Sequence, residues 1–144
     1  MSISVHLQQE QLRHLLFMLA QTCLTQMNWK ILVSLTRIIN LVTFNVDMTA
    51  AGNNAVGYIT GSFTDDGFGN WQIIPMTQVG TTRTYTFSTN LSYGQTVEYY
   101  YLSDNEWSAR ETVPQNLQVI WNDRGYTVPN NSTPVVLNNT WVNP

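Results

Sequence analysis

The pattern of apolar and polar residues changes character near residue 41. From there, apolar side chains recur at every second position, as in LVTFNVDM, whose apolar members include Val42, Phe44, Val46 and Met48. Since neighbouring side chains of a β-strand point to opposite faces, this alternation predicts a strand with one buried face and one wet face. Residues 41–48 therefore open a β-rich domain.

Further strand-like segments follow at regular intervals, separated by Gly, Asn, Asp and Pro. They span residues 56–63, 71–76, 82–89, 95–102, 125–128 and 134–138. The turn NLSYG joins two of them, and its Gly94 occupies a position that needs a positive φ. Seven or eight short strands with turns between them are typical of an antiparallel β-sandwich, so we predict an all-β domain over residues 41–144.

The first forty residues follow a different pattern. Leucines recur there at spacings of three and four, which is compatible with a helix: Leu12, Leu15, Leu16 and Leu19. Polar residues between Arg13 and Lys30 keep each apolar run below the roughly 20 residues needed to cross a bilayer. Three interpretations stay open for residues 1–40: a degenerate or mis-started export leader, for which Met27 offers a second start, a helix that packs on the following domain, and a membrane anchor.

Composition narrows the classes of function. The 144 residues include six Lys and Arg against nine Asp and Glu, which gives a formal net charge of -3. No basic stripe exists to neutralise a phosphate backbone, so we expect no nucleic-acid partner. Cys23 is the single cysteine, which excludes a disulfide within the chain.

Six motifs of the predicted domain, in their order, resemble the starch-binding domains of carbohydrate-binding module family 20. They are VTFNV, GNWQ, VEYYYL, NEW, NDRGYTVP and VVLNNTWVNP. Through VTFNVDM and NEWSARETVPQN the chain is also similar to starch-binding-like sandwich modules of secreted Bacteroidetes proteins. The resemblance covers residues 42–144. It implies an immunoglobulin-like β-sandwich, secreted or held at the cell surface, that binds α-glucan without cleaving it.

The resemblance also implies a binding site built on two tryptophans, which correspond to Trp71 of GNW and Trp107 of NEW. The physical chemistry agrees, because a rigid, exposed indole can cover the apolar C–H face of a sugar ring. The sequence DNEWSAR around Trp107 is polar and has no apolar periodicity that would predict its burial. Trp71, by contrast, could equally begin a strand and pack in the core. Polar side chains nearby are candidates for bonding sugar hydroxyls: Asn70, Asn105, Glu106 and Gln115.

Departures from the family pattern limit the site. Tyr100 stands where the family often has a lysine, and we count its phenol among the site candidates. The regions that correspond to the family's second site, TAAGNNA and VGTTRT, hold no aromatic residue, so we predict one site at most. Trp121 and Trp141 are interpreted as packing residues. The loop TDDGFGN lacks the ligand spacing of a calcium-binding loop and is interpreted as a turn, so neither a metal nor another cofactor is expected.

Two functions from different classes remain. The first is a non-catalytic module that recognises starch-like α-glucan by stacking on exposed tryptophans. Catalysis is not expected, because a small sandwich offers little cleft in which to hold two carboxylates roughly 5 to 9.5 Å apart and desolvate one of them. The second is a structural or self-assembling secreted protein that has kept the sandwich and lost sugar binding, with a homo-oligomer formed through the N-terminal segment.

Overall fold

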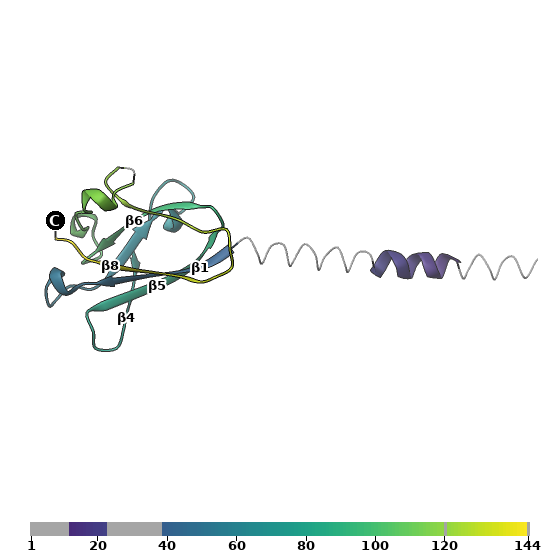
Figure 1. Ribbon diagram of the computed structural model, residues 1–144, viewed down its shortest axis with the longest axis horizontal. Helices are drawn as coiled ribbons and strands as arrows, with labels where there is room; N and C mark the ends of the chain where they lie inside the picture. Colours follow the sequence, from purple (N-terminus) through teal and green to yellow (C-terminus); the bar gives the residue numbers. More distant parts are fainter. Residues whose placement is uncertain (1–11, 23–38, 120, 144) are drawn as a thin grey trace, which may run out of the picture. The chain divides into compact units, whose positions relative to one another are not determined.

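The structure of the protein, a computed structural model, describes residues 12–22, 39–119 and 121–143 (Figure 1). The chain divides into two units, Met1–Arg37 and Ile38–Pro144. In the first unit, residues 12–22 form a helix, which confirms the helical interpretation of that stretch. Its large apolar side chains are exposed: Leu12, Leu15, Leu16, Phe17, Met18 and Leu19. Within the described ranges no helix is long and apolar enough to cross a membrane. The leader features around Met27 lie outside the described residues.

In the second unit, the described residues form eight strands in two four-stranded sheets, which confirms the predicted all-β sandwich. One sheet has the strand order β4-β5-β1-β8, and the other has the order β3-β2-β6-β7. The strands are β1 (Ile39–Asp47), β2 (Tyr58–Gly61), β3 (Ile74–Pro75), β4 (Thr77–Gln78), β5 (Thr84–Ser92), β6 (Thr96–Leu102), β7 (Arg124–Thr127) and β8 (Val135–Thr140).

Two details of the sheets differ from the prediction. The strands β1 and β8 pair in parallel, so the expectation of purely antiparallel sheets is wrong at this pair. Strands joined by a tight hairpin must run antiparallel, whereas strands far apart in sequence are free to pair either way. Of the predicted strand 71–76, only Ile74 and Pro75 form a strand, β3, and Pro75, which has no N–H to donate to a ladder, lies in this edge strand. The next strand, β4, begins just beyond the predicted range and belongs to the other sheet. The N–H of Met76, between them, donates to the carbonyl of Gly57.

The core lies between the two sheets and begins with the alternation of β1. Val42, Phe44 and Val46 are fully buried, as the sequence predicts. The Phe44 ring packs 5.1 Å from the Phe63 ring and 5.0 Å from the Tyr99 ring, centroid to centroid. Aromatic pairs at this separation contribute about 0.5–1.5 kcal/mol each beyond the burial of their area. The aromatic cluster therefore ties β1 of one sheet to β6 of the other.

A buried ion pair fixes the long segment between β6 and β7. Arg124, the first residue of β7, donates from Nε and Nη2 to the two carboxylate oxygens of Glu111, each over 2.7 Å. Glu111 also accepts the backbone N–H of Tyr101 in β6, and the guanidinium donates to the carbonyl of Thr140 in β8. The pair thus closes residues 112–123 into a loop whose two ends are anchored on the sandwich.

Candidate functional site

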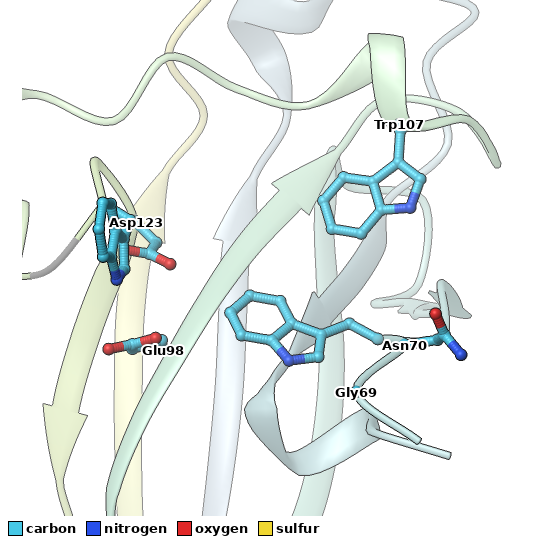
Figure 2. Close-up of a pocket in the computed structure, with 7 residues that line it drawn as sticks. Gly69, Asn70, Glu98, Trp107 and Asp123 are labelled. Atoms are coloured by element: carbon cyan, nitrogen blue, oxygen red, sulfur yellow. The ribbon is translucent and has the colours of Figure 1, made fainter. Parts of the chain in front are cut away.

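A cleft of about 400 Å³ opens on the sandwich domain (Figure 2). Three parts of the chain line it. The loop before β3 supplies Gly69, Asn70 and Trp71, strand β6 supplies Glu98, and the β6–β7 segment supplies Trp107, Trp121 and Asp123. The cleft therefore combines three indole rings with two carboxylates.

The loop that carries Trp71 is held by its own acidic side chains. Asp66 Oδ1 accepts the backbone N–H of Phe68 over 2.9 Å and that of Asn70 over 3.3 Å, and Asp65 Oδ1 accepts two further N–H groups of the loop. Bonds of this kind, from Asp to the backbone just ahead, build turns, which agrees with the interpretation of TDDGFGN as a turn. The Phe68 N–H above all holds the pKa of Asp66 below its ordinary value. Trp71 follows this turn, pairs with Asp65 in a single β-bridge and is half-buried.

Trp107 is presented by a short turn of chain after β6. It begins the 3-10 helix η3 (Trp107–Ala109). The Ala109 N–H donates to the Glu106 carbonyl, and the Ser103 N–H donates to the Ala109 carbonyl, each over 2.9 Å. The Trp107 side chain is 44% exposed, in keeping with the polar sequence around it.

Trp121 is 84% exposed, so its interpretation as a packing residue is wrong. Trp121 and Asn122 both have positive φ angles, of 56° and 71°. A left-handed backbone is unfavourable for a bulky residue, and strain of this kind concentrates at functional sites. Two hydrogen bonds hold the turn, from the Val119 N–H to the Asp123 carbonyl over 3.0 Å and from the Tyr100 hydroxyl to the Trp121 carbonyl over 3.3 Å. The turn therefore displays an indole that nothing in the described domain covers.

Two carboxylates give the cleft its charge. Asp123 is only 3% exposed, and its Oδ1 has no hydrogen-bond partner among the described residues. Burial raises the pKa of Asp123, and burial together with the nearby Asp123 charge raises the pKa of Glu98. Figure 2 shows both carboxylates on one side of the cleft and Asn70 on the other. No Lys or Arg is among the described residues that line the cleft, so the site is anionic.

The structure brings together three of the predicted site residues, Trp71, Trp107 and Asn70. Tyr100 lines a neighbouring cavity of about 270 Å³, which it shares with Trp121. The remaining predicted polar side chains are exposed but are not among the described residues that line the cleft: Asn105, Glu106 and Gln115. Their part in binding stays a prediction.

Sequence reasoning missed four lining residues: Gly69, Glu98, Trp121 and Asp123. The Asn-Asp pair after Trp121 is a turn signal that could have indicated exposure. Trp141, by contrast, is 2% exposed, which confirms its prediction as a packing residue. Within the described ranges, no group of three or more His, Cys, Asp or Glu side chains could hold a metal ion.

The sequence matches no protein-family model and no curated protein. Among solved structures it is similar to the glucoamylase of Hormoconis resinae, at 20% identity and a TM-score of 0.51, over 74% of this chain and 18% of that chain. It is also similar to a glycoside hydrolase family 15 glucoamylase from Hypocrea jecorina, at 21% identity and a TM-score of 0.49, over 73% of this chain and 17% of that chain. A gamma-CGTase from alkalophilic Bacillus clarkii matches at 17% identity and a TM-score of 0.46, over 72% of this chain and 15% of that chain. The chain spans less than a fifth of each protein, and the likeness to the Hormoconis resinae enzyme supports the sandwich fold.

Proposed function

We propose that this protein is a non-catalytic carbohydrate-binding module that recognises α-glucan chains by stacking them on exposed tryptophans. The observation that carries the proposal is the presence of Trp71, Trp107 and Trp121 in one open cleft. Indoles exposed to water by 44% and 84% leave apolar area uncovered, which favours contact with a ligand that has an apolar face. The resemblance to starch-binding domains and the fold similar to one part of a glucoamylase favour α-glucan as that ligand.

The cleft offers both kinds of contact that a sugar needs. The indole faces can cover the C–H face of a pyranose, and covering it yields roughly 25 cal/mol per Å² of apolar area. The carboxylates of Glu98 and Asp123, which line the cleft, are acceptors suited to hydrogen bonds from sugar hydroxyls. Association also costs several kcal/mol of lost freedom, so an open site of this size predicts a dissociation constant of roughly 10 µM to 1 mM.

The proposal includes no chemical step. A glycosidase must hold its substrate between two carboxylates in a site from which water is largely excluded. The cleft described here is instead walled by exposed rings, which suits binding along a chain better than bond cleavage. Incubation with starch should therefore release no reducing sugar. Secretion or display at the cell surface is part of the same proposal.

The test is a titration with β-cyclodextrin followed by intrinsic tryptophan fluorescence and by calorimetry. The wild-type chain should bind saturably, and Trp107→Ala and Trp121→Ala should each weaken binding by about tenfold or more, since losing one stacking side chain removes roughly 1.5 kcal/mol or more. Leu117→Ala is the matched control, because Leu117 is an exposed apolar residue of the same segment that is not among the described lining residues. Equal affinity in all four proteins, or no binding by the wild type, would overturn the proposal.

A second candidate function is self-assembly through the N-terminal segment. The observation that favours it is the helix of residues 12–22, whose six large apolar side chains are each more than half exposed. Burial of such a surface between copies would be favourable. Sedimentation of the full chain should then show an oligomer that Leu15→Glu together with Leu19→Glu dissociates. A wild-type chain that sediments as a monomer would eliminate this candidate.

A further inference from the structure

The charge of the cleft points to a more specific ligand than a neutral glucan. Glu98 and Asp123 are the charged side chains among the described lining residues, and both are acidic. Asp123 is nine-tenths buried or more, yet one of its carboxylate oxygens has no hydrogen-bond partner within the described chain. A buried carboxylate oxygen without a partner is costly, so a hydrogen-bond donor supplied by a ligand would be favourable beside Asp123.

Neighbouring cations of the described chain do not supply that donor. Arg124 directs Nε and Nη2 to Glu111 over 2.7 Å and is committed to that pair. The Arg110 guanidinium lies over the Tyr100 ring, 5.7 Å from its centroid, and lines the neighbouring cavities instead of this one. No positive charge among the described lining residues therefore compensates the two carboxylates, and burial, together with the Asp123 charge, raises the pKa of Glu98.

An ammonium group suits both parts of the cleft. Carboxylates bond an ammonium through charge-assisted hydrogen bonds, which are roughly twice as strong as neutral ones. The faces of indole rings attract a cation as well, and Trp is the best of the aromatic side chains in this respect. A metal ion is a poorer match, because Ca²⁺ takes six to eight oxygen ligands and no metal-binding group occurs among the described residues.

We propose that the cleft of Trp71, Trp107, Trp121, Glu98 and Asp123 prefers glucans that carry an ammonium group, as amino sugars do, over their neutral counterparts. This inference rests on the proposed function, since it takes the same cleft to be the sugar site. The carboxylates select the ammonium, and the indoles hold the ring that bears it.

The experiment compares two ligands that share one scaffold, β-cyclodextrin and 6-amino-6-deoxy-β-cyclodextrin. Calorimetry with the full chain at pH 6 and low salt keeps the amine protonated and the screening weak. The amino derivative should bind about tenfold more tightly than the neutral ring, and added salt should reduce this ratio. In Asp123→Asn and in Glu98→Gln the ratio of the two affinities should fall toward one. In Asp104→Asn, which changes an exposed carboxylate away from the described lining of the cleft, the ratio should stay as in the wild type.

The outcomes separate the two proposals. Equal binding of both ligands by the wild type overturns the ammonium preference and leaves the α-glucan proposal standing. Binding of the amino derivative alone supports the ammonium site and overturns the neutral α-glucan proposal. Failure of both ligands overturns both. If the tenfold ratio of the two affinities persists in both Asp123→Asn and Glu98→Gln, the selectivity lies elsewhere and the inference is overturned. Two variants are used so that the test still stands if one of them fails to fold.

Discussion

Removal of one partner of the buried Glu111–Arg124 pair should destabilise the domain severely. In Glu111→Ala, the Arg124 guanidinium stays buried at 3% exposure and loses the two hydrogen bonds, each of 2.7 Å, that balance its charge. Breaking such a pair costs about 3–5 kcal/mol, because an uncompensated charge is left in the interior. Domains of this kind have a total stability of about 5–15 kcal/mol, so the loss is a large fraction of it.

Urea denaturation followed by tryptophan fluorescence measures this loss. With a denaturant slope of about 2 kcal/mol per molar urea, the midpoint of Glu111→Ala should fall by about 2 M. Glu106→Ala is the control, since Glu106 is an exposed carboxylate of the same segment, and its stability should stay within about 0.5 kcal/mol of the wild type. Replacing both partners, Glu111→Met with Arg124→Met, should regain part of the loss, because no charge is then left unpaired. A midpoint for Glu111→Ala that equals that of Glu106→Ala would refute the reasoning.

Two further predictions concern the loop and the strand beside the cleft. Gly61→Ala should lower the free energy of unfolding by about 1–3 kcal/mol in the same urea assay, because a Cβ at this position overlaps the Glu98 carbonyl oxygen and lies 2.9 Å from the Tyr99 Cβ; an unchanged midpoint would contradict this packing. Asp66 has a folded-state pKa below the ordinary 3.8, so its contribution to loop order is complete above that pH and is lost as the pH falls through the lower, folded-state value. Slow amide exchange at Phe68 and Asn70 should accordingly be present at neutral pH, decline in strong acid, and be absent at neutral pH in Asp66→Ala; protection that persists in the variant would argue against the turn bonds.

The sequence predicts the fold better than it predicts the site. The alternation in residues 41–48 predicts burial directly, because a strand at the surface of a core needs apolar residues on one face and polar residues on the other. The burial of side chains along β1 agrees with this alternation. The exposure of Trp107 is also predicted from its neighbours in sequence, because the residues around it are polar. The exposure of Trp121 is not predicted, because the apolar run LQVI before it suggests packing. In the structure, Val119 of that run lies against Gly125, and the chain turns sharply at Trp121.

The two carboxylates of the cleft could not be assigned from their neighbours in sequence. Glu98 alternates with the buried Val97 and Tyr99 and so is read as an ordinary outward-facing residue of β6. Asp123 lies in a turn signal, where acidic residues are common. Glu98 and Asp123 come together only because the β6–β7 segment approaches the outer face of β6. The Glu111–Arg124 ion pair fixes this approach, and it joins two positions that share no local sequence pattern.

The parallel pairing of β1 with β8 has a consequence for the order of events in folding. Asn45 on β1 bonds Asn138 on β8 across 93 positions of sequence, and β1 lies inside its sheet between β5 and β8. Long-range pairings of this kind slow folding. At synthesis rates of about 5–20 residues per second, one edge of β1 waits roughly 5 to 20 s for its partner to leave the ribosome. During that interval a nine-residue strand with an open backbone edge is exposed to other nascent chains, so the yield of native protein should depend on chaperones or on the speed of translation.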